Sequence, residues 1–275
     1  MANIEETEFV AFDLETTGLH PIACRIVEIG AIRFRGDGEV MGQFQQLVNP
    51  QIEIPLEVTR IHGITDRMVA NQPVISQVLP QFLSFLGNPS SILLAHNAPF
   101  DLGFLSVDLG LQQLSCPEHP VLDTCKLARG RLPVANYRLE TIGQHLQLID
   151  TEKHRALDDA VLLMHVFLHL MRERLSVRHS DQLFDLASRL SFDMFATIVE
   201  DAPQGYEQLW LAMRESTPVS IEYQGGGSPG ARRTITPNGA VQMRGRVYLS
   251  AYCHRGHCDK TFRLDRITSF QRVSE

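Results

Sequence analysis

The order in which strand-like and helix-like segments follow one another most constrains what this chain can fold into. Glu8–Asp13 is a short apolar run, and Ile26–Arg35 alternates before the turn Gly36–Gly38, after which Val40–Val48 returns as the second arm of a hairpin. Further on, strands predicted at Ser91–Ala95 and Val121–Thr124 alternate with helices predicted at Pro73–Leu86 (kinked or split by Pro80), Pro99–Leu109, Tyr137–Leu146 and Arg155–Arg174. Strands that alternate with helices after an antiparallel hairpin predict a mixed α/β sheet.

The character of the sequence changes after residue 175. Ser180–Val199 has amphipathic helical spacing, and the stretch Asp201–Gly205 breaks it. Beyond Thr217 come short β segments with glycine-rich turns, at Val219–Tyr223, Val241–Met243, Val247–Cys253 and Thr261–Leu264. We therefore expect an α/β domain over 1–175, a helical linker over 176–206, and a small all-β barrel or sandwich over 207–275.

The charges divide along the same line. The whole chain has a net charge of −7, but residues 1–175 carry 13 Lys and Arg against 21 Asp and Glu, whereas residues 217–275 carry 9 against 4. An acidic domain can hold cations and a basic one can hold phosphates. No apolar run is long enough to span a membrane, and the acidic N-terminus does not resemble a secretory signal. The five cysteines are scattered apart from Cys253 and Cys258, which favours a reducing cytoplasm.

Two acidic residues follow the first strand directly. Asp13 and Glu15 point to the same face of a strand because side chains repeat every two residues. Two adjacent carboxylates next to an apolar strand repel each other unless a cation lies between them, and a hard divalent cation with oxygen ligands suits the pair. The alternative is a solvated strand edge that carries two acids.

Two more carboxylates join this candidate site. Asp101 lies at the start of a helix that follows a buried strand, at the edge of the sheet where α/β proteins place their sites. The alternative is an acid that is favoured in the first turn of a helix by the helix dipole. In the helix at 155–174, Asp159 shares the buried stripe with Ala156, Ala160 and Leu163, while Asp158 shares the wetter stripe with His165. An acid on an apolar stripe needs a partner, so Asp159 is the predicted metal ligand and Asp158 the surface acid.

Three motifs in this order resemble those of the DEDD (DnaQ-like) exonuclease superfamily. They are D-x-E-T-T-G at 13–18, H-N-A-x-F-D at 96–101 and H-x-A-x-x-D at 154–159, and the last is typical of the histidine (DEDDh) subclass. Residues 61–65 and 121–124 are similar to segments of the proofreading exonucleases. The resemblance implies an RNase H-like mixed sheet flanked by helices.

The resemblance also implies a reaction and its residues. Asp13, Glu15, Asp101 and Asp159 would hold two Mg²⁺ or Mn²⁺ ions. His154 would act as general base, since an imidazole titrates near neutral pH. The residues expected next to the terminal nucleotide are Thr16, Leu19, His62 and Asn97. The expected activity is 3′→5′ removal of nucleotides from single-stranded or frayed DNA. An exoribonuclease on the same scaffold is the alternative, because no motif here reads the 2′-hydroxyl.

The C-terminal region resembles the WYL domain, through Val247–Cys253 and Thr261–Ile267. The resemblance implies an SH3-like barrel that binds a nucleotide-type ligand or nucleic acid, although Val247 stands where the family has tryptophan. The expected binding surface includes Arg232, Arg233, Arg244, Arg246, Tyr248, Arg263 and Arg266. A solvated barrel with surface arginines is the alternative. A second alternative, a ligand-sensing regulator, is disfavoured because no helix-turn-helix is evident and all four metal-binding carboxylates are present.

Overall fold

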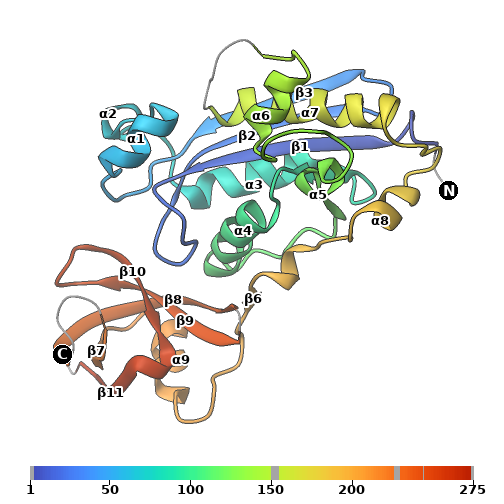
Figure 1. The fold of residues 1–275 in the computed structure, drawn as a ribbon. Coiled ribbons are helices and arrows are strands. Elements are labelled where there is room, and N and C mark those ends of the chain that lie inside the picture. Colours follow the sequence, from blue (N-terminus) through green and yellow to red (C-terminus); the bar gives the residue numbers. More distant parts are fainter. Residues whose placement is uncertain (1–2, 150–154, 226–229, 244, 274–275) are drawn as a thin grey trace. The chain divides into compact units, whose positions relative to one another are not determined.

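The structure is a computed structural model that describes residues 3–149, 155–225, 230–243 and 245–273 (Figure 1). The chain forms two compact units. The first comprises residues 1–19, 24–102 and 117–191, and the second comprises residues 20–23, 103–116 and 192–275. Each unit is described by itself.

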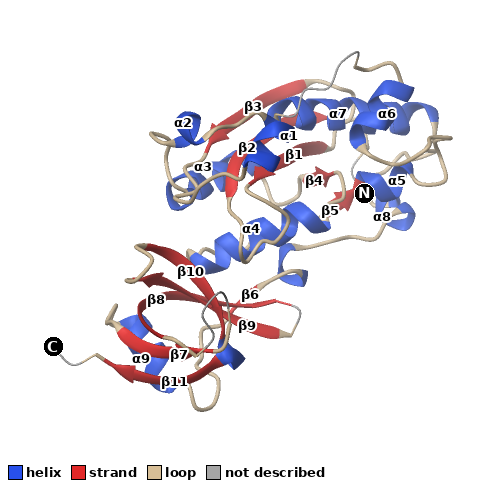
Figure 2. Ribbon diagram, turned by 60° about the vertical axis from the view of Figure 1, so that its left-hand side comes forward, coloured by secondary structure: helices blue, strands red, loops and turns tan. Residues whose placement is uncertain are grey.

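A five-stranded mixed sheet is the centre of the first unit. Its strands are β1 (Glu8–Thr16), β2 (Ile26–Arg35), β3 (Val40–Leu47), β4 (Ile92–Ala95) and β5 (Val121–Asp123), in the spatial order β3-β2-β1-β4-β5 (Figure 2). The β1–β2 and β2–β3 pairs are antiparallel, and the β1–β4 and β4–β5 pairs are parallel. The predicted mixed α/β sheet with its opening hairpin is therefore confirmed.

The two faces of β1 contact different helices. Phe9 packs on Phe167 of α7 (Ala156–Glu173), with 4.8 Å between ring centroids, while Phe12 packs on Phe82 of α3 (Ile75–Leu86) at 6.0 Å. Because side chains alternate along a strand, the odd-numbered residues of β1 face α7. Asp13 and Glu15 therefore share the face that α7 covers. Helix α3 runs through Pro80 as one element, so Pro80 does not split the helix, which was one of the two expected effects (a kink or a split).

Five further helices, most of them short, connect these elements within the described residues. They are α1 (Leu56–His62), α2 (Asp66–Val69), α4 (Pro99–Leu111), α5 (Thr124–Ala128) and α6 (Leu139–His145). Helices α2 and α5 have four and five residues, which is too short for a helical period to show in the sequence. Helices α4 and α6 lie where the sequence predicts them.

The helix predicted over Ser180–Val199 is wrong for most of that segment. Only α8 (Gln182–Leu186), a 3₁₀ turn at Phe192–Met194 and the short strand β6 (Thr197–Ile198) form there. Leu190 exchanges both backbone hydrogen bonds with Val121 of β5, each 2.9 Å long. The backbone N–H and C=O of Leu190, which a continuous helix would use, are thus bonded to the sheet, while the apolar side chains Leu183 and Phe192 are still buried.

The second unit contains an antiparallel sheet at its C-terminal end. Its elements are α9 (Glu207–Arg214), β7 (Val219–Tyr223), β8 (Arg232–Met243), β9 (Arg246–Cys253), β10 (Cys258–Arg263) and β11 (Ile267–Arg272). The strand order is β10-β9-β8-β7-β11, with β6 paired to β8 (Figure 2). The all-β character is confirmed beyond Thr217, whereas α9 is a helix within the region 207–275 that was expected to be all-β. The sequence pattern also did not reveal β11. Trp210 of α9 is fully buried with Phe262 and Leu249 in this unit's core. Within the described residues, no helix is long and apolar enough to cross a membrane.

Candidate active site

Three carboxylates from two elements converge on one point of the first unit. Asp13 and Glu15 extend from β1 on the face toward α7, and Asp159 comes from the first turn of α7. One carboxylate oxygen from each of the three lies within 4.8 Å of the others. Oxygen ligands at this spacing suit a hard divalent cation.

Asp101 is the fourth carboxylate and the most deeply buried. It lies in the first turn of α4, directly after β4, and is only 2% exposed. Its Oδ1 atom has no hydrogen-bond partner among the described residues. Buried carboxylate oxygens without partners are costly, so an ion that this oxygen could bind would relieve the cost.

The turn before Asp101 is held by a carboxylate of the neighbouring strand. Asn97 has a left-handed backbone (φ 66°), and its N–H donates to Oδ1 of Asp123 at the end of β5 (3.1 Å). The same oxygen accepts from the backbone of Cys125 (3.0 Å), and His96 contacts Thr124 Oγ1 through its Nδ1 atom (3.0 Å). The bonds of Asn97 and His96 tie the end of β4 to the end of β5 and thereby place the first turn of α4.

Three of the four acids have raised pKa values, which is the electrostatic signature of a cation site. Burial, and then the neighbouring carboxylates Asp101 and Asp159, raise the pKa of Asp13 well above its usual range. Burial, and then Asp159, raise the pKa of Glu15 to about 8, and burial raises the pKa of Asp101 to about 8. Acids whose ionisation is disfavoured by burial and mutual repulsion are stabilised as anions by divalent cations. The residues present therefore fit the metal ions that the motifs imply.

The two adjacent aspartates of α7 differ in their surroundings. Asp159 is half-buried and belongs to the carboxylate cluster, whereas Asp158 is exposed. His154, the predicted general base, lies outside the described residues, as does Arg244 of the expected C-terminal surface.

The expected substrate residues lie near the ends of their elements. Thr16 is buried at the end of β1, and its hydroxyl donates to the carbonyl of Gly18 (2.7 Å). Leu19 follows two turn residues later with 77% of its surface exposed. His62 ends α1 in a buried position, where its Nδ1 accepts from the backbone N–H of Ile64 (3.0 Å). The structure thus leaves Leu19 open to a ligand and encloses Thr16 and His62.

The C-terminal arginines are spread over several strands of the second unit. The Arg233 guanidinium lies over the ring of Tyr223 (6.0 Å to the centroid), and Arg263 donates to Asp265 (2.6 Å). Arg232 lies beside Arg233 on β8, and Arg266 lies in the 3₁₀ turn after β10. Of the expected set, Tyr248 and Arg246 line a common hollow.

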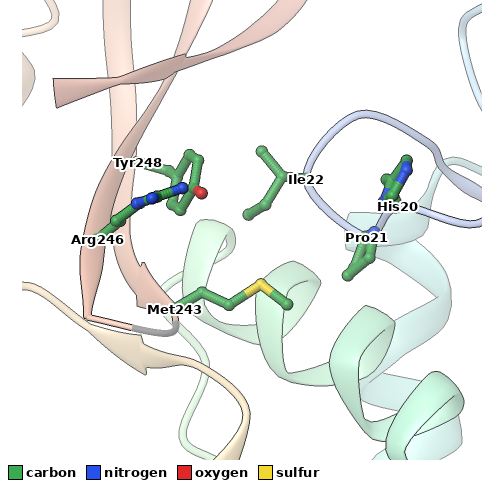
Figure 3. Close-up of a pocket in the computed structure, with 6 residues that line it drawn as sticks. All are labelled: His20, Pro21, Ile22, Met243, Arg246 and Tyr248. Carbon is green, nitrogen blue, oxygen red and sulfur yellow. The ribbon is translucent and has the colours of Figure 1, made fainter. Parts of the chain in front are cut away.

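That hollow is a pocket of about 480 Å³ in the second unit (Figure 3). Met243, Arg246 and Tyr248 form one side of it, and residues 20–22 form the other. The lining combines one guanidinium, one phenol ring and one imidazole with apolar side chains. Guanidinium and aromatic groups are two kinds of group that proteins use to contact phosphates and bases.

Comparisons with known proteins agree with this architecture. Residues 10–167 match the model of the Exonuclease family, and residues 205–272 match the model of the WYL domain. The first match covers more than half of the chain. The chain therefore belongs to the exonuclease family, whose members are hydrolytic nucleases, and it carries a WYL domain.

Two of its relatives are DNA polymerases III of the PolC type. The one from Clostridium perfringens is 41% identical over 156 residues, which is 56% of this chain and 10% of the relative. The one from Thermotoga petrophila is 34% identical over 221 residues, 78% of this chain and 16% of the relative. The chain thus spans only a small part of the length of these relatives.

Two solved structures share the fold. The nuclease domain of 3'hExo, a DEDDh family member, bound to rAMP, has a TM-score of 0.56 at 20% identity, over 64% of this chain and 98% of that one. E. coli Exonuclease I in complex with a dT13 oligonucleotide has a TM-score of 0.57 at 16% identity, over 89% of this chain and 55% of that one.

Proposed function

We propose that this protein is a 3′→5′ exonuclease that removes nucleotides from single-stranded or frayed DNA ends with two divalent ions, Mg²⁺ or Mn²⁺. One observation carries the proposal. Four carboxylates from three separate elements are gathered in and around one partly buried cluster, and the pKa values of Asp13, Glu15 and Asp101 are raised, which a bound cation would counteract.

Each residue has a distinct task in this proposal. Asp13, Glu15, Asp101 and Asp159 hold the ions, and His154 accepts the proton of the attacking water. The ions, when bound, supply the positive charge that stabilises the scissile phosphate and the leaving 3′ oxygen. Leu19 packs against the terminal nucleotide, while Thr16, Asn97 and His62 shape the walls of its site. The cytoplasm is the compartment that we infer for this reaction.

The PolC-type relatives are named as DNA polymerases, which supports DNA as the substrate of this protein. An exoribonuclease is the second candidate, because a structural neighbour holds rAMP. The 2′-hydroxyl is the group that separates the two substrates.

Matched DNA and RNA oligonucleotides labelled at the 5′ end test this function. With Mg²⁺, we expect a ladder of products that shorten one nucleotide at a time from the 3′ end, with DNA degraded faster than RNA. A 3′-terminal phosphate should block the reaction, because it occupies the place of the free 3′ end. Degradation from the 5′ end, or internal cuts in a circular single strand, would contradict the proposal.

For the C-terminal region, we infer an SH3-like barrel over residues 207–275 that follows the exonuclease domain (1–175) and a connecting segment (176–206). Its net positive charge and the pocket at Arg246 and Tyr248 support a role in holding the single strand or a nucleotide-type ligand. A polymerase or clamp partner is not part of this proposal.

Substitutions in the pocket separate a charge contact from a stacking contact. Arg246→Ala should reduce the slope of log affinity against log salt for a long single strand by about 1, because one phosphate contact is lost. Tyr248→Ala should weaken binding by about 1–3 kcal/mol without changing that slope. Arg255→Ala, which removes the same charge from an exposed turn, is the matched control. Equal effects of Arg246→Ala and Arg255→Ala would remove the pocket from this role.

A further inference from the structure

A fifth carboxylate lies next to the metal-binding cluster and is fully buried. Glu28 of β2 is the register partner of Glu15 across the β1–β2 pair. The guanidinium of Arg155 binds it as a fork, with Nε donating to Oε2 (2.9 Å) and Nη2 donating to Oε1 (2.5 Å). Gln45 donates to Oε1 as well (2.9 Å). Every oxygen of this buried acid is therefore satisfied.

The same carboxylate caps helix α7 from outside. The backbone N–H of Ala156, the first residue of α7, donates to Oε2 of Glu28 (3.1 Å). The residue before it, Arg155, offers no side-chain cap of its own. An anion at a helix N-terminus satisfies a free N–H and is favoured by the helix dipole. Strand β2 thus supplies the cap that the helix lacks.

Gly30 allows the helix to approach the strand this closely. It lies two residues beyond Glu28 on the same face of β2, opposite Asp13 in the register. A Cβ atom at this position would lie 2.1 Å from the carbonyl carbon of Ala156 and from the backbone nitrogen of Leu157. The first turn of α7 is consequently pressed directly onto the backbone of β2.

This anchored turn carries Asp159. The backbone N–H of Asp159 donates to the carbonyl of Arg155 (3.0 Å), the first hydrogen bond of α7. The interactions that hold Arg155 in place therefore also hold the Asp159 carboxylate in position next to Asp13 and Glu15. The charges of the site also balance. When all are ionised, five carboxylates and one guanidinium carry a net charge of −4, which two divalent cations would neutralise. These groups belong to Asp13, Glu15, Asp101, Asp159, Glu28 and Arg155.

We propose that the Glu28–Arg155 fork is a positioning device for the metal site, which holds Asp159 at the distance from Asp13 and Glu15 that the ions require. Neither residue of the fork is a metal ligand in this scheme. The inference rests on the metal site of the proposed function. It goes beyond that function because it assigns the metal affinity in part to two residues outside the ligand set.

Isothermal titration calorimetry tests the inference. Mn²⁺ is titrated into the full chain without nucleic acid, and the dissociation constant for Mn²⁺ is measured. Arg155→Gln should weaken Mn²⁺ binding by about 10- to 100-fold, as is typical when the partner of a metal-binding group is removed. Arg155→Lys retains the charge but loses the fork, so binding should stay weaker than in the wild type. Arg35→Gln breaks the exposed bridge to Glu39 (2.7 Å) and is the matched control, with no expected change.

The outcomes separate this inference from the proposed function. Unchanged Mn²⁺ affinity in a folded Arg155→Gln variant would overturn it and leave the fork a purely structural bridge. Full recovery by Arg155→Lys would also overturn it, because charge alone would then suffice. If the glutamine variant does not fold, the lysine variant carries the test. Wild-type Mn²⁺ binding that depends on Arg155, without cleavage of any oligonucleotide, would remove the proposed function and leave the positioning role intact.

Discussion

Asp159→Asn should lower turnover about 100-fold or more, whereas Asp158→Asn should retain most of the wild-type activity. The two residues are neighbours in sequence and carry the same charge, but Asp159 belongs to the carboxylate cluster and Asp158 is exposed. Asparagine has nearly the shape of aspartate and loses its charge, so it binds a divalent cation poorly. Loss of several kcal/mol of transition-state stabilisation corresponds to this factor, since each 1.36 kcal/mol is tenfold in rate.

Single-turnover rates with saturating Mg²⁺ provide the measurement. The matched pair is its own control, because both substitutions remove one negative charge from the first turn of α7. A rate loss of the same size in both variants would show that the effect comes from the charge at the helix start. In that case Asp159 would have no special contact with a metal ion.

Removal of divalent metal should abolish nucleotide release and make stability depend strongly on pH. In chelator, the pKa values of Glu15 and Asp101 are raised to about 8, largely by burial. Folded-state pKa values above the usual range give stability that is fully present below about pH 4 and is lost as pH rises through about 8. The melting temperature in chelator should therefore fall between pH 6 and pH 9, by at least about 5 °C.

Added Mn²⁺ should raise the melting temperature most at pH 9, because the cation replaces the protons that the acids otherwise need. Asp13→Asn should be more stable than the wild type in chelator at pH 8, since one of the repelling acids is gone, and should be inactive with metal. Asp158→Asn serves as the exposed control. Thermal melts and release of labelled nucleotide measure the two effects. Full activity in excess chelator would refute the two-metal reaction.

Much of the first unit could be predicted because its signals are local. Side chains alternate along a strand and repeat every 3.6 residues along a helix, whatever the strand or helix packs against. These two periods suffice to place Asp13 and Glu15 on one face of β1 and to separate Asp159 from Asp158 on α7. The hairpin of β2 and β3 was equally readable, because a glycine-rich turn lies between two runs of strand-like residues.

The segment from Ser180 to Val199 shows where local signals fail. Its amphipathic spacing predicts a helix, but Leu190 pairs with β5 and most of the helix is absent. The spacing of apolar residues predicts which side chains will be buried, but it does not predict which groups the backbone N–H and C=O will bond to. Those partners come from Val121, which lies 69 residues away in the sequence, and no local pattern can specify them.

The sequence by itself determined the positions of the sheet strands along the chain and the mixed α/β class, the all-β character of the chain beyond Thr217 and the four acids that we assign to the metal ions. Only the tertiary structure decided how those acids are held. The register that sets Glu28 opposite Glu15, the close approach at Gly30 and the fork from Arg155 all join segments that are far apart in the chain. The physical reason is that periodicity is a property of one element, whereas register and close packing are properties of two elements at once.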